Sequence, residues 1–340
     1  MKLTRFQELF DIFKENVFDF YLNNPISEKY RLQRIDKRLT IVDIDKVKEM
    51  TIDHYIKKDK VFVNTENKKI NMILENFVNV MNDSFDEEDL GNLYDNIIWV
   101  LFKKYISFNY NGDYDPITNI IRSISEEDLD SIHHELIHLS ANPYDDTNNY
   151  GGFYYTIDKY CIGYGLDEGY TELLNKRYFN SKTENAYRLQ IMICKYIEEL
   201  VGQRKMEKMY LNANLFGLIK ELKQTYDVKE IERFIAAVDF THDYDDISML
   251  ADVEIETLYS QIETIIIFLF KGYCKKLLNK NLPIEILEEL LILYLNNLII
   301  EFEFPVDQYT IGEINKIVEE NVNKNIKLDI NLFKKRKNVL

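Results

Sequence analysis

The feature that most constrains this chain is the segment at residues 125–142, which contains the pattern His-Glu-x-x-His. On an α-helix, residues four positions apart differ by about 40° around the axis, so both imidazoles leave the same face one turn apart. Two imidazoles in this arrangement can bind one metal ion, with Glu135 turned toward a water on that ion. We therefore expect His134 and His138 to be metal ligands on a helix over residues 126–141.

The residues around the pattern favour a helix. Ser125 and Asp128 resemble a capping box at its start, and Asn142 followed by proline is a stop signal at its end. Four apolar residues form a stripe on the side opposite the histidines: Leu129, Ile132, Leu136 and Leu139. The simplest alternative is that the histidines only form a polar helix face or are hydrogen-bonded inside the core. A third ligand is needed to decide between the two interpretations.

A candidate third ligand lies thirty residues after His138, in the segment Gly-Leu-Asp-Glu-Gly-Tyr-Thr-Glu that begins at residue 165. We expect a second helix over residues 167–179, with Asp167 as its N-cap. Glu168 and Glu172 then share one helix face, and either could reach the ion. Two histidines and one carboxylate with an open fourth position are typical of a catalytic zinc site, whereas closed structural sites use thiolates. The pattern predicts one zinc ion per chain.

This combination resembles the gluzincins, which are zinc metallopeptidases of thermolysin-like type. Their signature joins His-Glu-x-x-His to a downstream helix with Glu-x-x-x-Asp/Glu, often inside Asn-Glu-Gly. In this chain the second motif reads Asp-Glu-Gly, with Asp167 in the place of the asparagine. The resemblance covers about residues 125–180.

The resemblance implies a role for each residue of the two motifs. His134, His138 and Glu168 would bind the zinc ion. Glu135 would act as the general base. Glu172 would accept a hydrogen bond from a ligand histidine and orient it, as partners of metal-bound histidines commonly do.

One histidine outside the central segment is a candidate catalytic residue. Peptide hydrolysis builds negative charge on the carbonyl oxygen, and a positioned His or Tyr donor can stabilise it. Thermolysin-like enzymes have a downstream histidine in this role, held by an acidic residue, and His242 with Asp243 or Asp239 resembles that arrangement. Tyr244 or Tyr164 could serve instead. The simpler interpretation of His242 is a surface-loop histidine.

The rest of the chain predicts a mostly helical α+β fold, and the resemblance implies that this fold is zincin-like. Residues 1–180 would form the zinc-binding part, with a small N-terminal sheet, the active-site helix and the second ligand helix. Residues 181–340 would form a helical C-terminal part packed against it. Further helices are expected from apolar periodicity at 1–22, 70–81, 90–104, 185–201, 204–213, 215–225, 228–238, 253–279, 284–302 and 311–322.

Strands are expected in the first half of the chain only. Two weak signals lie at 39–42 and 61–64. A hairpin is expected between 105–110 and 117–123, since Asn-Gly follows the first of these runs. A second hairpin, between 153–156 and 160–164, would lie at the mouth of the metal site.

Composition narrows the possible partners and the compartment. A net charge of −16 argues against nucleic acid or an anionic membrane as a partner and mildly favours basic or neutral substrates. The first 22 residues are charged throughout, and the longest apolar runs are short or interrupted, so we expect no signal peptide and no membrane span. The expected compartment is the cytoplasm. No pattern in the chain indicates an oligomeric state.

We therefore expect a zinc-dependent metallopeptidase that acts on a peptide or protein substrate. One alternative is a catalytically inactive binding or scaffold protein with a zincin fold, in which the metal is structural or absent. Another is a zinc hydrolase that acts on a non-peptide amide.

Overall fold

A computed structural model of the chain describes residues 68–97, 100–104, 112–116, 119–143, 150–157, 160–183, 186–242, 252–278, 280, 282–322 and 325–334. The expected helix at 1–22 and the expected strands at 39–42, 61–64 and 105–110 lie outside these residues. The described part is mostly helical and contains two small three-stranded sheets, so its class is α+β.

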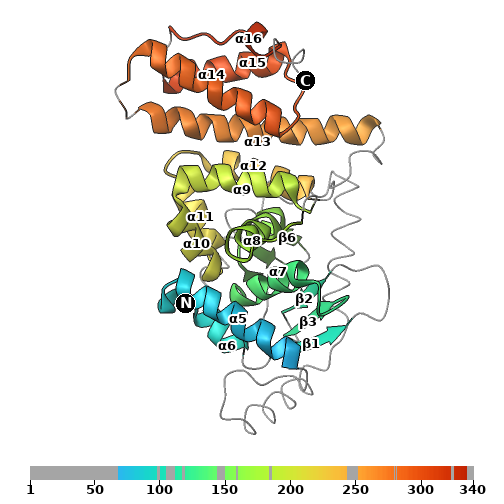
Figure 1. Cartoon of the computed structure of the whole chain (residues 1–340). Helices are drawn as coiled ribbons and strands as arrows, with labels where there is room; N and C mark the ends of the chain where they lie inside the picture. The colour runs from blue at the N-terminus through green and yellow to red at the C-terminus, as the bar shows by residue number, and fades with distance from the viewer. Residues whose placement is uncertain are drawn as a thin grey trace.

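The described elements are stacked in layers along the long direction of the molecule (Figure 1). One end holds the first helices and the first sheet, the middle holds α7 and α8, and the other end holds the last helices. The helices are α5 (Lys68–Ser84), α6 (Gly91–Ile97), α7 (Leu129–Ser140), α8 (Tyr164–Phe179), α9 (Arg188–Val201), α10 (Gln203–Leu211), α11 (Leu215–Leu222), α12 (Val228–Thr241), α13 (Asp252–Leu278), α14 (Ile284–Glu301), α15 (Gln308–Asn321) and α16 (Asn331–Lys334), with a short 3-10 turn η1 (Glu87–Asp89) between α5 and α6.

The first sheet has the strand order β1-β3-β2. Strand β1 (Leu101–Lys104) pairs in parallel with β3 (Ile120–Ser123), and β2 (Asp113–Asp115) pairs with β3 in antiparallel fashion. The expected helix over 90–104 is therefore wrong in its second half: α6 ends at Ile97, and Leu101–Lys104 form strand β1. The backbone of β1 is satisfied by β3, a partner distant in sequence that helical periodicity cannot reveal.

The second sheet contains the hairpin that the sequence predicts between 153–156 and 160–164. Strand β5 (Tyr154–Ile157) pairs with β6 (Tyr160–Ile162), and the short strand β4 (Tyr150–Gly151) pairs with the other edge of β5. All these pairs are antiparallel. The chain leaves β6 through Gly163 and enters α8 directly, so the hairpin fixes the start of that helix.

Helix α7 is shorter than the expected range 126–141, and its start is not the predicted capping box. Asp128 is the N-cap, and its side chain accepts a hydrogen bond from the backbone N–H of Ser131. The Ser125 hydroxyl instead accepts from the N–H of Glu127 in the preceding turn. Three residues of the predicted apolar stripe are buried, but Leu129, at the first helical position, is exposed.

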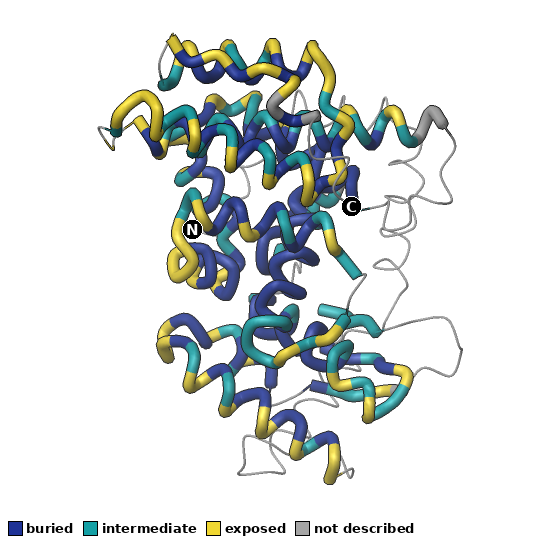
Figure 2. The backbone as a smooth tube through the Cα atoms, turned by 45° about the horizontal axis from the view of Figure 1, so that its top comes forward, coloured by how far each residue is buried: buried dark blue, intermediate teal, exposed yellow. Residues whose placement is uncertain are grey.

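Helix α8 begins three residues before the expected range 167–179, because Gly163 is its N-cap. Asp167 is therefore not an N-cap, as the sequence suggested, but a side chain inside the helix. Every residue of α8 from 165 to 175 is buried, and the helix runs through the middle of the molecule (Figure 2). The layers on both sides of α8 thus enclose it.

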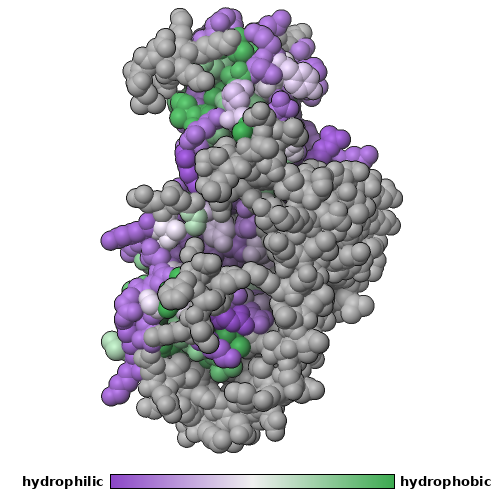
Figure 3. Space-filling view, turned by 90° about the vertical axis from the view of Figure 1, so that its right-hand side faces the viewer, coloured by the Kyte–Doolittle hydropathy of each residue, from purple (hydrophilic) through white to green (hydrophobic). Residues whose placement is uncertain are grey.

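Helices α9 to α15 agree with the sequence to within a few residues at each end, whereas the short helix α16 was not predicted. Helices α9 and α12 pack on α8, and α13 packs across α9 and α12 and also contacts α14 and α15 (Figure 1). Apolar side chains remain exposed in this last layer, at the top of Figure 3, and α14 contributes Ile284, Ile286, Leu293 and Ile300 to them. The last layer therefore exposes apolar side chains of α14 at the surface.

In the part of the chain that the structure describes, no helix combines the length and apolar character needed to cross a membrane.

We predict that Gly169→Ala destabilises the fold. A Cβ at Gly169 would lie 2.6 Å from the backbone carbon of Gln190 in α9, so the two helices would have to move apart. Overpacking of this kind costs about 1–3 kcal/mol. Gly312 in α15 is the matched control, since a Cβ there meets no atom within 4 Å. Gly312→Ala should raise stability by about 0.4–1 kcal/mol. Thermal and urea unfolding of both variants tests the contrast, and equal effects of the two changes would contradict it.

Candidate metal centre

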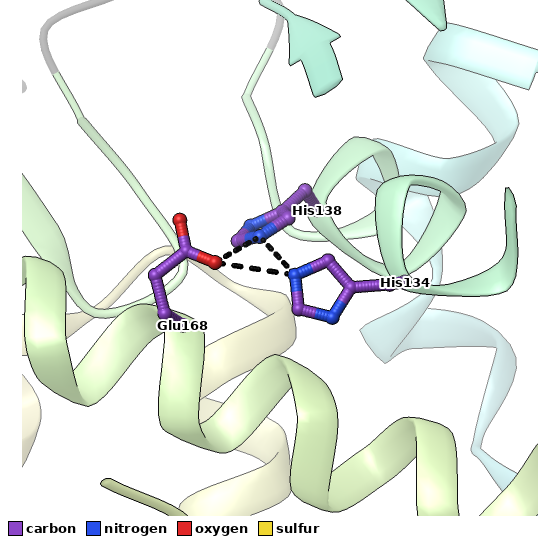
Figure 4. Close-up of side chains that lie close together, drawn as sticks. All are labelled: His134, His138 and Glu168. Atoms are coloured by element: carbon purple, nitrogen blue, oxygen red, sulfur yellow. Dashed lines mark hydrogen bonds and ion pairs between the residues drawn. The ribbon is translucent and has the colours of Figure 1, made fainter. Parts of the chain in front are cut away.

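Three side chains from two helices converge on one point in the middle of the molecule (Figure 4). His134 and His138 extend from α7, and Glu168 extends from α8. The Nε2 atoms of the two histidines are 3.2 Å apart, and Oε2 of Glu168 is 3.2 Å from the first and 3.3 Å from the second. The structure thus brings together the three residues that the sequence suggests as ligands.

The spacing of these three atoms fits a tetrahedral metal ion. Zinc binds histidine nitrogen and carboxylate oxygen at about 2.0–2.2 Å, and two ligands at that distance in a tetrahedron are about 3.3–3.5 Å apart. The observed triangle, with sides of 3.2, 3.2 and 3.3 Å, is close to this value. His134 and Glu168 are buried, and His138 is nearly so. One ion can therefore contact all three atoms without a change of backbone.

Each histidine is oriented by a carboxylate on the far side of its ring. His134 Nδ1 is 2.9 Å from Oε2 of Glu172, and His138 Nδ1 is 3.2 Å from Oδ2 of Asp167. A carboxylate at Nδ1 holds a proton there and leaves Nε2 as the atom that faces the metal. Glu172 thus occupies the position that the sequence suggested for it, and it is Glu168 that lies among the ligand atoms.

The two carboxylates are themselves held by other groups. Glu172 accepts hydrogen bonds from the Asn175 amide and the Ser181 hydroxyl, at 3.0 and 2.8 Å. Asp167 accepts a bond of 2.9 Å from the backbone N–H of Phe153, the residue just before β5. The second sheet therefore fixes the side chain that orients His138.

Electrostatics in the cluster favour positive charge on the imidazoles. Burial disfavours the charged form of His134, but hydrogen bonds to Glu168 and Glu172 outweigh it and raise its pKa to about 9. Burial also opposes charge on His138, yet the charges of Glu168 and Asp167 raise its pKa well above the ordinary value. In Glu168 burial is outweighed by both imidazoles, so its pKa is well below the ordinary range. The carboxylates of the cluster thus favour positive charge on the two imidazoles.

Glu135 is near enough to His134, His138 and Glu168 for their charges to act on it, but it does not belong to the group of three candidate ligands. It is buried on α7, and burial raises its pKa to about 7, while the charges of His134 and His138 oppose the rise. A carboxyl group whose pKa is near the working pH is suited to accept and return a proton. Its position agrees with the role of a base.

The start of β2 closely approaches Glu135. A Cβ on Gly112 would lie 3.2 Å from Oε1 of Glu135 and only 2.1 Å from the Ser131 hydroxyl, so the close approach requires glycine. The next residue, Asp113, is near enough for its charge to raise the pKa of Glu135. Within the described residues, β2 pairs with β3 on one side only. In the described part of the chain, β2 is thus the edge strand of this sheet next to the candidate base.

The position of α8 is set by a capping interaction from α12. The Asp239 carboxylate accepts hydrogen bonds of 2.8 Å from the backbone N–H groups of Gly163 and Gly165. These N–H groups at the helix start have no acceptor within the helix, and a carboxylate there also interacts favourably with the helix dipole. The candidate ligand Glu168 is thereby anchored to the C-terminal helices as well as to α7.

His242 lies near the cluster, at the C-cap of α12, but a tyrosine stands between it and His134. The ring of Tyr187 stacks on both histidines, with ring centroids 5.5 Å apart in each case. Tyr164 contacts His242 edge-on at 4.8 Å. The catalytic role of His242 stays a prediction. Of the alternatives, Tyr164 is near His242, and Tyr244 lies outside the described residues, as does Asp243.

Two residues of the site were missed in the sequence. The contact of Asp167 with His138 could have been found from the position of Asp167 next to Glu168. If the second helix is taken to begin before residue 167, Asp167 is a side chain on that helix and can reach His138. Tyr187 gives no such signal. It follows Glu168 by nineteen residues, and its backbone is in the left-handed region, with φ 57° and ψ 29°.

We predict that Glu168→Ala weakens zinc binding more than Glu172→Ala does. Loss of a ligand removes a bond to the ion, whereas loss of an orienting partner typically weakens metal affinity about 10–100-fold. Titration against a chelator ranks the two variants, with His138→Ala as a control that should lose the ion. The reverse ranking would show that Glu172 is the ligand.

Zinc affinity should also rise steeply with pH up to about 9, where His134 titrates in the metal-free protein. Below its raised pKa the imidazole holds a proton that the metal must displace. For each proton displaced, the zinc affinity therefore rises about tenfold per pH unit. Calorimetry in buffers of different ionisation enthalpy measures the released protons. An affinity that stops rising near pH 7, as expected for ordinary histidines, would contradict this prediction.

Comparison of the chain with protein-family models, with curated proteins and with solved structures finds no match. Any inference about function therefore rests on the residues of this centre and on their geometry.

Proposed function

We propose that this protein is a zinc-dependent metallopeptidase with a zincin-like arrangement of its two ligand helices. The observation that carries the proposal is the convergence of His134, His138 and Glu168 with Glu135 beside them. Three ligands and an adjacent base are the parts that metal-assisted hydrolysis needs, whereas a purely structural zinc site would have four protein ligands.

Zinc bound at this centre would activate a water molecule and polarise the scissile carbonyl group. Glu135 takes a proton from the attacking water and later returns it to the leaving amine. His134 and His138 keep their Nε2 atoms directed at the centre because Glu172 and Asp167 hold their Nδ1 protons. His242, if it reaches the carbonyl oxygen, would stabilise its developing charge.

The edge strand β2 favours a peptide over a small amide as the substrate. An extended peptide can add to an exposed strand edge through main-chain hydrogen bonds. Gly112, the residue just before β2, lies against Glu135, so a peptide paired with this strand would pass the base. The net charge of −16 favours neutral or basic peptides.

The test is Glu135→Gln, which should retain one zinc ion per chain and lose hydrolysis. The amide cannot accept the proton of the attacking water, and loss of a general base lowers the rate by about 10²–10⁴-fold. Zinc content is measured by elemental analysis, and hydrolysis by mass spectrometry of a diverse peptide mixture. Loss of zinc in the variant would mean that Glu135 is a ligand.

The unmodified protein separates the rival functions in the same assay. A zinc-loaded protein that cleaves peptides supports the proposal. Cleavage of non-peptide amides alone would indicate a hydrolase of another class. A zinc-loaded protein that cleaves neither would indicate a binding or scaffold protein.

A further inference from the structure

Helix α14 has an outward face that carries a regular apolar stripe. Ile286, Leu293 and Ile300 recur every seven residues, and their exposed fractions are 43%, 51% and 53%. Seven residues are close to two helical turns, so the three side chains lie in one row along the helix. The buried residues of α14 lie on the opposite side, which packs into the last layer: Leu291, Tyr294, Leu295 and Leu298. A row of this spacing is the pattern by which one helix packs against another.

A shallow hollow of about 390 Å³ lies beside this stripe. All the side chains that line it belong to α14: Glu285, Glu288, Glu289, Ile292, Leu293 and Asn296. Leu293 belongs to both the stripe and the hollow, so the two form one continuous surface. This surface, the outward face of α14, therefore combines an apolar row with a flank of glutamates.

The glutamates of the outward face lack basic partners. Helix α14 contains four glutamates and neither lysine nor arginine. In the part of the chain that the structure describes, Glu285, Glu288 and Glu289 form no ion pair and no side-chain hydrogen bond. Like charges three and four positions apart on a helix repel each other. A cationic partner beside them would remove this repulsion.

The helix dipole accounts for only one of these three charges. Glu285 lies in the first turn of α14, where a negative charge interacts favourably with the helix dipole. Glu288 and Glu289 lie in the second turn, and the effect falls off within the first. Their charges are therefore not explained by the stability of α14 itself.

We propose that the outward face of α14 is a docking site for an amphipathic basic helix of another protein. Apolar side chains of that helix would pack on the stripe, and its lysines or arginines would lie beside the glutamates of the hollow. A second copy of this chain fits less well, because its own α14 would bring the same glutamates to the contact. An anionic membrane is disfavoured by the same charges.

The docking site is remote from the metal centre. Helix α14 belongs to the last layer, and the layers that contain α13, α12 and α9 lie between it and α8 (Figure 1). The proposal is therefore independent of metal binding and of hydrolysis, and its test measures binding alone.

Two designed three-heptad peptides probe the face in a titration with the full chain. Both have leucine at the two apolar heptad positions, and the remaining positions are mainly lysine in one peptide and mainly glutamate in the other. The titration is done at an ionic strength of about 0.15 M, which screens distant charges. The lysine peptide should bind and the glutamate peptide should not. Equal binding of the two peptides, or binding of neither, would overturn the proposal.

A charge-reversal variant tests whether the glutamates of the hollow make the contact. In Glu288→Lys/Glu289→Lys the affinity for the lysine peptide should fall more than about tenfold, because like charges would then face each other. Glu319→Lys/Glu320→Lys is the matched control, since these glutamates are exposed on α15 and the net charge changes equally. The control should bind nearly as tightly as the unmodified protein. Equal losses in both variants would mean that the peptide responds only to net charge, which would overturn the proposal.

The variant Leu293→Asn tests the apolar stripe. The affinity for the lysine peptide should fall about tenfold, since the contact loses a leucine. Met72→Asn is the control, because Met72 is an exposed apolar side chain on α5. All the changed side chains are at the surface, so thermal unfolding should show that each variant folds. Unchanged affinity in Leu293→Asn would overturn the proposal. So would self-association of the unmodified chain that this change abolishes, since the face would then bind a second copy.

Discussion

The structure depends on one crossing, in which α7 and α8 bring three electron-pair donors to within 3.3 Å of one another. Without a cation or protons among them, these atoms would repel. The surrounding charges make the requirement stronger. Glu135, Asp167, Glu168 and Glu172 are all buried around two imidazoles, and buried charges need partners.

The raised pKa values of the two histidines also show that the cluster needs positive charge among its donor atoms. In the metal-free protein, His134 and His138 each favour a second proton near neutral pH, which places two positive charges among the carboxylates. A divalent ion brings the same charge to the same point and releases those protons. The cluster therefore favours positive charge at this point, and metal binding should stabilise the fold as well as the site.

The sequence predicted the parts of this arrangement that depend on local spacing. Residues four apart on a helix share a face, so the helical period alone pairs His134 with His138 and Glu168 with Glu172. Features that depend on distant partners were wrong or not visible. Strand β1 was expected to be helical because β3, its partner, lies elsewhere in the chain. The start of α8 was placed too late because Gly163 is capped by Asp239 from α12.

Helix α8 shows why the centre could be found from a motif but not from apolar periodicity. The helix is buried on all sides, so it lacks the polar outer face that marks a surface helix. Its polar residues face inward instead, among them Asp167, Glu168, Thr171 and Glu172. Polar groups in such a position are costly unless each has a partner, and here the partners are imidazoles, amides and hydroxyls of the site. Buried polar residues on a helix reduce stability, and proteins keep such residues chiefly at functional sites. The composition of α8 is therefore what is expected of a helix that forms part of a functional site.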